Sequence, residues 1–490
     1  MSLLIFLSSG LFLGWSVGAN NTGNVFGTAV GSKMVSFKTA AAVCSIFLIL
    51  GALMSGAGTT LTLSKLGSVN ELGGAFIVAL AAAVAIFGMT RFKLPVSTSQ
   101  SIVGSIIGWN FFSGAITDYE SLTKIVSSWI IAPVISGIFA IMTYIFVKKL
   151  LAHIKIHILY LDFYNRIGLI IVGGFGAYSL GANNIANVMG VFVPVAPLRP
   201  IDTFLGTISG SEQLFIMGGI AMAVGVITYS GKVLRTVGNN IMPLTPITAF
   251  IVVFSSSMVL FLFSSQSLER FLIMHGLPAI PLVPIASAQA VIGAIIGIGI
   301  YQGGKELNFR VIGKIASGWV TAPVIACMVS LMSLYVIQNV FNQPVYKPIR
   351  YIMSHEVEKR LISEGIAFAE MDLLVDQEYN NAVEFRSALE NHSHYISDSH
   401  IKRIIALSEL KNLTVNIDLI QVEIKEGWFT QEQSESLRRL NDQSFKYAWE
   451  LRDALEAYGT GWKLKDNNTP EGKHINKNIN LKFEYICKKF

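Results

Sequence analysis

The feature that most constrains the fold is a short motif of glycine and asparagine that occurs twice, each time inside a long apolar stretch. The first copy is GANNTGNVFGTAVGSK, from Gly18 to Lys33, and the second is GANNIANVMG, from Gly181 to Gly190. Glycine and asparagine favour helix ends, so we expect each copy to interrupt a membrane helix. The polar backbone groups freed in this way are tolerated at membrane depth only where they line a cavity or are buried in protein. Interruptions at matching positions in two halves are typical of the substrate site of a secondary transporter.

Composition places most of the chain in a membrane. Hydrophobic residues make up 52% and charged residues 14% of the 490 residues, whereas roughly 25% of the residues in soluble domains are charged. Apolar windows long enough to span a bilayer follow one another from Ser2 to about Phe341. Met1 to Trp15 has neither a basic start nor a cleavage site, which favours a first membrane helix over a signal peptide. We therefore expect a multi-pass integral protein of the cell (inner) membrane.

Two further pairs of matched segments indicate an internal duplication. One pair aligns Gln100 with Gln289, and the other aligns Trp129 with Trp319. If each half crosses the membrane five times, the two halves are inverted relative to each other. The predicted fold is an all-α polytopic membrane protein, an inverted-repeat secondary transporter with broken helices and a C-terminal helical hydrophilic domain. The expected boundaries are 1–158 for the first repeat, 159–346 for the second and 347–490 for the hydrophilic domain.

The distribution of basic residues predicts the orientation. Short cytoplasmic loops collect lysine and arginine, and with Met1 outside most basic loop residues fall inside. The same orientation puts the tail outside, which is permitted because long domains do not follow the charge rule. The residues predicted to lie inside are Lys33, Lys38, Arg91, Lys93, Lys148, Lys149, Lys155, Lys232, Arg235, Lys305 and Arg310.

Polar side chains around the interruptions are the candidate ligands of a small anion. Buried amides cost free energy unless they are paired, so their repetition at equivalent places indicates a binding role. Pro95 removes a backbone N–H and loosens its helix, and the hydroxyl groups that follow it can donate to an anion. Any single serine or threonine could instead bond back to its own helix. The expected ligands are Asn20, Asn21, Asn183, Asn184, Ser97, Thr98, Ser99 and Ser287, supported by Asn24, Asn187, Gln100 and Gln289.

These motifs resemble the signature segments of the inorganic phosphate transporter (PiT) family. Besides the two Gly-Ala-Asn-Asn copies, the resemblance includes LPVSTSQ, from Leu94 to Gln100, and GKVLRTVGNNIMPLTP, from Gly231 to Pro246. It covers Met1 to about Phe341, and no part of the tail shares in it. It implies an inverted-repeat transporter, usually a homodimer in the lipid bilayer, that couples phosphate uptake to sodium or protons.

Two departures from the family pattern concern the coupling ion and the substrate. The family has Gly-Ala-Asn-Asp where this chain has Asn21 and Asn184, and it has histidine where this chain has Gln100. A sodium ion could be held by the Asn21 and Asn184 oxygens together with backbone carbonyls, whereas no mid-membrane carboxylate or histidine is present to carry a coupling proton. An amide can also donate to an anion that has no proton of its own, so sulfate remains an alternative to phosphate.

Other classes of function are weighed against transport. A membrane sensor that reports the level of an anion to the tail would share all of these features. A membrane enzyme is not expected, because no nucleophile, base and orienting group converge in the repeats. Three scattered cysteines are too few for a metal cluster, and we expect no cofactor beyond a possible Na⁺. A net charge of +6 without a basic run gives no sign of a nucleic-acid partner.

Overall fold

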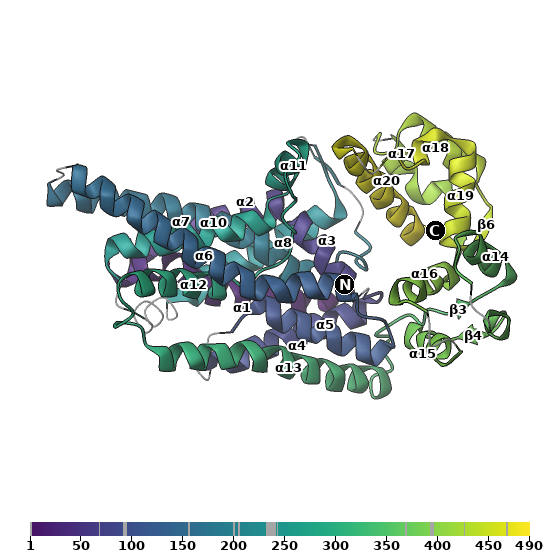
Figure 1. Ribbon diagram of the computed structural model, residues 1–490, viewed down its shortest axis with the longest axis horizontal. Coiled ribbons are helices and arrows are strands. Elements are labelled where there is room, and N and C mark those ends of the chain that lie inside the picture. Colours follow the sequence, from purple (N-terminus) through teal and green to yellow (C-terminus); the bar gives the residue numbers. More distant parts are fainter. Residues whose placement is uncertain are drawn as a thin grey trace. The chain divides into compact units, whose positions relative to one another are not determined.

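The chain divides into a helical unit and a tail unit, whose elements are labelled in Figure 1. The computed structural model describes residues 2–67, 69–91, 96–154, 157–198, 201–203, 206–231, 242, 244–367, 370–392, 396–425, 427–466 and 469–490. The helical unit comprises residues 1–112, 117–271 and 279–347, and the tail unit comprises residues 113–116, 272–278 and 348–490.

Long apolar helices build the helical unit. In the part of the chain that the structure describes, eight helices are long and apolar enough to cross a membrane. Two others, α5 and α12, have only 16 and 15 residues, or about 24 and 22 Å at 1.5 Å per residue, which is less than a bilayer core. The helices are α1 (Ser2–Gly31), α2 (Phe37–Ser55), α3 (Ala57–Leu66), α4 (Leu72–Arg91), α5 (Thr98–Ser113), α6 (Tyr119–His153), α7 (Ile158–Met189), α8 (Gly210–Thr228), α10 (Pro246–Ser264), α11 (Gln266–Met274), α12 (Ser287–Tyr301) and α13 (Phe309–Asn339), with a hairpin of β1 (Ile201–Thr203) and β2 (Gly206–Ile208).

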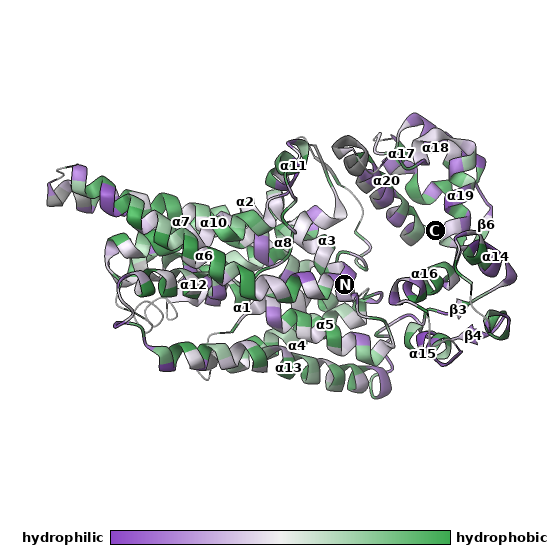
Figure 2. Ribbon diagram, viewed as in Figure 1, coloured by the Kyte–Doolittle hydropathy of each residue, from purple (hydrophilic) through white to green (hydrophobic). Residues whose placement is uncertain are grey.

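The outer surface of these helices suits a lipid environment. Large apolar side chains are exposed along α6, for example Ile130 and Phe146, and along α13, for example Val320 and Met332. Figure 2 shows hydrophobic residues predominating along the long helices and a more mixed pattern in the tail unit. Exposed apolar surface on this scale is unusual for a soluble monomer. The predicted all-α polytopic membrane fold is confirmed.

Glycines let the first helices of the two halves pack closely. Gly18 of α1 lies against the backbone of Met222 in α8, and Gly181 of α7 lies against the backbone of Leu48 in α2. A methyl group on either glycine would collide with a carbonyl oxygen, so both glycines serve close helix contact, as small residues do in membranes. The contact is reciprocal in each pair, with Gly225 on Trp15 and Gly51 on Tyr178.

The predicted breaks in the first helix of each half are therefore wrong. Helix α1 runs unbroken through Asn20 and Asn21, and α7 runs unbroken through Asn183 and Asn184. The chain is interrupted instead before the short helices α5 and α12. Pro95, Lys93, Lys155, Arg235 and most of the segment from Gly231 to Pro246 lie outside the described residues.

The first helices of the two halves, α1 and α7, run in opposite directions. Gly10, near the start of α1, lies against Phe192, just past the end of α7, whereas Phe26, near the end of α1, lies against Gly173 in the middle of α7. Helices α1 and α7 are therefore antiparallel. Their contact brings the two Gly-Ala-Asn-Asn segments to the same depth of the unit.

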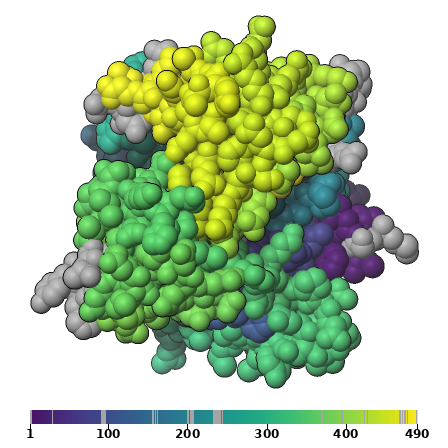
Figure 3. Space-filling view, turned by 90° about the vertical axis from the view of Figure 1, so that its right-hand side faces the viewer, coloured from purple at the N-terminus to yellow at the C-terminus, as the bar shows by residue number. Residues whose placement is uncertain are grey.

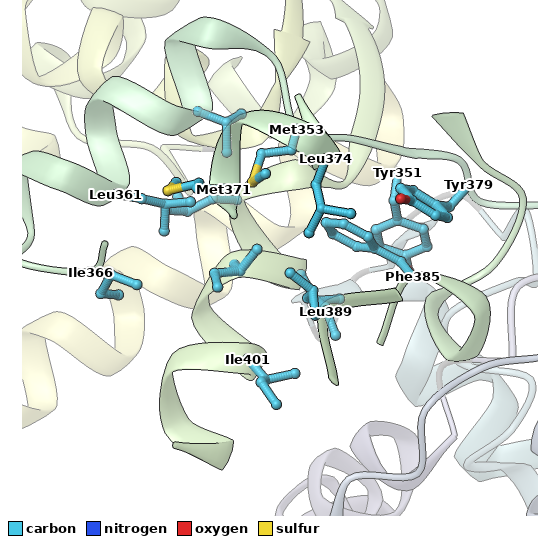
Figure 4. Close-up of a cluster of buried hydrophobic side chains, with 14 of the residues drawn as sticks. Tyr351, Met353, Leu361, Ile366, Met371, Leu374, Tyr379, Phe385, Leu389 and Ile401 are labelled. Atoms are coloured by element: carbon cyan, nitrogen blue, oxygen red, sulfur yellow. The ribbon is translucent and has the colours of Figure 1, made fainter. Parts of the chain in front are cut away.

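The tail unit is mainly helical and has two hydrophobic cores. In the first core, the Phe385 ring stacks on Tyr351 and Tyr379 at centroid distances of 6.0 and 4.8 Å (Figure 4). The second core surrounds Leu451 and Trp462. Figure 3 shows the surface of this unit, with the last helices of the chain in yellow.

The elements of the tail unit include two antiparallel strand pairs, β3 with β4 and β5 with β6. They are β3 (Tyr351–Ile352), α14 (His355–Ser363), η1 (Met371–Leu374), β4 (Glu378–Tyr379), α15 (Ala382–His392), α16 (Asp398–Ser408), β5 (Leu410–Thr414), η2 (Ile417–Ile420), α17 (Gln421–Lys425), α18 (Gln431–Arg439), β6 (Ser444–Tyr447), α19 (Ala448–Tyr458), η3 (Thr460–Trp462) and α20 (Pro470–Lys489).

Candidate functional site

An amide–hydroxyl network connects α1 and α7 with the starts of α5 and α12. Asn21 Nδ2 donates to Asn184 Oδ1 at 3.4 Å and to Thr98 Oγ1 at 3.5 Å. Asn24 Nδ2 donates to Ser287 Oγ at 3.2 Å. The two contacts of Asn21 are at the long limit for hydrogen bonds, so they are weak and easily exchanged for a better acceptor.

Asn187 extends this network toward α5. Its Nδ2 donates to Ser99 Oγ at 2.9 Å and to Asn184 Oδ1 at 3.2 Å. Ser97 sits one position before α5, where its Oγ accepts from the backbone N–H of Gln100 at 3.3 Å. Ser97 therefore serves as a cap of α5, the role in which serine stabilises a helix start.

Asn183 fixes the extended segment that leads into α12. Its Nδ2 donates to Ile285 O at 2.8 Å, and its Oδ1 accepts from Ile285 N at 2.8 Å. Ser99 Oγ donates to the same carbonyl at 3.1 Å. Asn183 is completely buried, so both amide groups are used away from water. No signal in the sequence predicts the role of Ile285, because this residue contributes only backbone groups.

Asn20, which aligns with Asn183, lies apart from the network. It lines a small cavity of about 20 Å³ together with Trp15, Ser16, Ala19, Ile86, Phe87 and Tyr229. A volume of this size holds about one water molecule, far less than an oxyanion needs. The two halves therefore use the same asparagine differently.

The starts of α5 and α12 supply backbone donors. Helix α12 begins at Ser287, and its N-cap residue, Ala286, has no side-chain cap. The first N–H groups of a helix have no partner within the helix, and the helix dipole adds positive potential there. A helix start that lies beside hydroxyl and amide donors is suited to a small anion.

The network is neutral and buried. Its residues are amides and hydroxyls, and Asn21, Thr98, Ser99, Asn184, Asn187 and Ser287 are each at most 5% exposed. Within the described residues, Asn187 Oδ1 has no hydrogen-bond donor. A buried acceptor left in this state costs about 1–3 kcal/mol, and a cation or a proton of the ligand would relieve that cost. The arrangement can thus hold an oxyanion by many donors and accept one positive partner.

Most of the predicted ligands thus come together. The network includes Asn21, Asn184, Thr98 and Ser99, with Asn187 making direct bonds to it, and Asn24 bonds to Ser287 at the start of α12. Asn183 and Ser97 hold the adjacent backbone. The Oε1 atoms of Gln100 and Gln289 are buried and have no donor among the described residues.

Comparison with known proteins identifies the family of the chain. The sequence pattern of the phosphate transporter family matches residues 17–269 and 280–447, so the match extends past Phe341 and into the tail, where no resemblance was expected. Proteins named as phosphate permeases are 25% identical in Pyrococcus horikoshii, over 66% of this chain and 94% of that protein, and 27% identical in Methanocaldococcus jannaschii, over 68% and 97%.

A solved structure gives the same result for the fold. The structure of a sodium-dependent phosphate transporter matches with a TM-score of 0.55 and 22% identity, over 69% of this chain and 99% of that one. At this identity the match shows the fold alone. Because the family pattern covers well over half of the residues, the chain belongs to the phosphate transporter family.

Proposed function

We propose that this protein is a secondary transporter that carries inorganic phosphate across the membrane by cation-coupled symport and alternating access. The observation that carries the proposal is the neutral network in which Asn21 and Asn184 meet Thr98 at the start of the short helix α5. Donors from α1, α5 and α7 lie at this point, which suits an oxyanion whose charge is spread over several oxygens.

The unpaired acceptor in the network favours phosphate over sulfate. Asn187 Oδ1 is buried and lacks a donor among the described residues. Hydrogen phosphate carries a proton that can satisfy such an oxygen, whereas sulfate carries none near neutral pH. Sulfate is therefore the competing substrate that the transport assay has to include.

Sodium is the proposed coupling ion. Amide oxygens are suitable ligands for a hard cation, and the side chains of Asn21 and Asn184 meet at 3.4 Å in one network. Asn187 donates to the Asn184 oxygen at 3.2 Å and would orient it. The solved relative is named as sodium-dependent, which supports the same choice of ion here.

The antiparallel course of α1 and α7 supports an inverted relation between repeats 1–158 and 159–346, the arrangement on which alternating access is commonly built. The unequal roles of Asn20 and Asn183 fit a state in which one half is engaged and the other is not. We include a homodimer in the proposal, with the exposed apolar faces of α6 and α13 available for lipid or a second copy.

The test is uptake into proteoliposomes that contain the purified protein. Labelled phosphate should accumulate under an inward sodium gradient and not when potassium replaces sodium, and unlabelled sulfate should compete poorly. The double variant Asn21→Ala with Asn184→Ala should lose most uptake. Gly313→Ala is the matched control, because open space surrounds that glycine. Saturable phosphate binding without flux would contradict transport and indicate a sensor, and equal uptake of sulfate would contradict the assignment of substrate.

A further inference from the structure

Among the buried polar atoms without a hydrogen-bond partner in the described residues, two acceptors and two donors occupy equivalent positions in the two halves. Two are acceptors, Gln100 Oε1 on α5 and Gln289 Oε1 on α12. Two are donors, Trp319 Nε1 on α13 and Trp129 Nε1 on α6. The sequence duplication aligns the glutamines with each other and the tryptophans with each other. An orphan acceptor and an orphan donor therefore occur once in each half.

Helix register places Gln100 and Trp319 at the same level. Gly104 of α5 lies against the backbone of Pro323 in α13, and one turn later Gly108 lies against that of Cys327. Because the residue numbers of these contacts increase together along both helices, α5 and α13 run parallel. Residues four apart share one helix face, so one turn before the Gly104 contact, Gln100 and Trp319 are on the facing sides of the two helices.

The same register relates Gln289 to Trp129. Gly293 of α12 lies against the backbone of Pro133 in α6, and Gly297 lies against that of Gly137. One turn earlier on each helix stand Gln289 and Trp129. The two helix pairs therefore repeat one geometry, and each of them leaves one amide oxygen and one indole N–H unpaired at facing positions.

We propose that Trp319 and Trp129 are positioning residues, whose indole N–H groups pair with Gln100 Oε1 and Gln289 Oε1, each through one bridging water. Each pairing satisfies two buried groups at once, which removes the cost of leaving either unpaired. Trp319 then holds the first turn of α5 in place, two residues from Thr98 of the network, and Trp129 does the same for α12. A role in transport rests on the proposed function, since it requires these helix starts to hold the anion.

Each proposed Trp–Gln pair lies next to a proline inside a long helix, where the helix can bend. Pro323 and Pro133 lie inside α13 and α6, and a proline leaves the carbonyl four residues before it without its helical donor. Those carbonyls belong to Trp319 and Trp129. Bending of the long helices at these points would therefore move the same residues that hold the starts of α5 and α12.

Indole NMR tests the pairing without reference to transport. The chain has seven tryptophans, and Trp319→Phe and Trp129→Phe assign two of the indole N–H resonances of the labelled full-length protein. Gln100→Leu should shift the Trp319 resonance upfield and leave that of Trp129 in place, and Gln289→Leu should do the reverse. The Trp109 resonance is the control for folding, because its Nε1 donates to Val345 O at 3.1 Å. A glutamine variant that leaves its partner's resonance in place would overturn the proposal.

Uptake kinetics test the positioning role. Losing one hydrogen bond should weaken apparent phosphate affinity about two- to tenfold, so Trp319→Phe and Trp129→Phe should raise the half-saturating phosphate concentration more than they lower the maximal rate. Wild-type kinetics in both variants would overturn the role. Shifted resonances in a protein that moves no phosphate would support the pairing and refute only the proposed transport.

Discussion

The contact between Asn183 and Ile285 gives the sharpest test of the site. Replacing Asn183 with alanine removes both hydrogen bonds to the Ile285 backbone, each 2.8 Å long. The carbonyl keeps a donor, because Ser99 Oγ still reaches it at 3.1 Å. The N–H loses its acceptor, and a buried orphan of this kind costs about 1–3 kcal/mol. If that cost falls on the phosphate-binding conformation, affinity should drop about 5- to 150-fold.

The assay is phosphate binding to the purified protein, measured together with initial rates of uptake in proteoliposomes. Asn20→Ala is the matched control: it removes the equivalent side chain of the first half, which lines a small cavity instead of the network. It should change affinity by less than the Asn183 variant does. Adding Ser99→Ala to Asn183→Ala should deepen the loss, because both groups of Ile285 are then unpaired. If Asn183→Ala binds phosphate normally while Asn20→Ala does not, the assignment of the two halves is reversed.

Three other outcomes follow from the packing and charge of the chain. Gly181→Val should lower the melting temperature, because overpacking costs about 1–3 kcal/mol where the new side chain meets Leu48 O. Gly31→Val is the control and should not lower it, because open space surrounds that glycine. Equal melting temperatures of the two variants would contradict the packing role of Gly181. If the tail is outside, a membrane-impermeant maleimide should label Lys359→Cys in intact cells and should not label Lys305→Cys. The reverse pattern would overturn the orientation. The native Cys487 is unsuitable for this labelling, because burial raises the pKa of its thiol to about 12. Arg403 lowers the pKa of Glu364, so this ion pair stabilises the tail at pH values above the unfolded pKa of about 4.3. That contribution is lost as the pH falls through the folded pKa. Glu364→Gln should therefore lower the melting temperature at pH 7 more than at pH 3, which thermal unfolding of the full chain checks.

The sequence alone predicts the residue types of the site. The duplicated motif places asparagine at equivalent positions such as Asn21 and Asn184, and these two side chains meet at 3.4 Å. Amides inside apolar helices need partners, so paired copies are expected to find each other. The segment from Ser97 to Ser99 is also predictable, because its hydroxyl groups follow a proline inside an apolar region.

The sequence does not predict what the glycines do. Gly18 and Gly181 could free the backbone at a break or allow two helices to approach, and both uses favour the same residue. The choice depends on the partner helix: carbonyls of Met222 and Leu48 occupy the space where a side chain would stand. A local pattern carries no information about that partner.

The different contacts of equivalent residues in the two halves also depend on the tertiary structure. Asn20 and Asn183 occupy matching positions in nearly identical motifs, yet only Asn183 meets the backbone of Ile285. Hydropathy and residue type are enough to predict the all-α membrane fold, the duplication and the chemistry of the candidate ligands. Which copy of the motif finds a partner depends on the packing, because that partner is a backbone segment brought close by other helices.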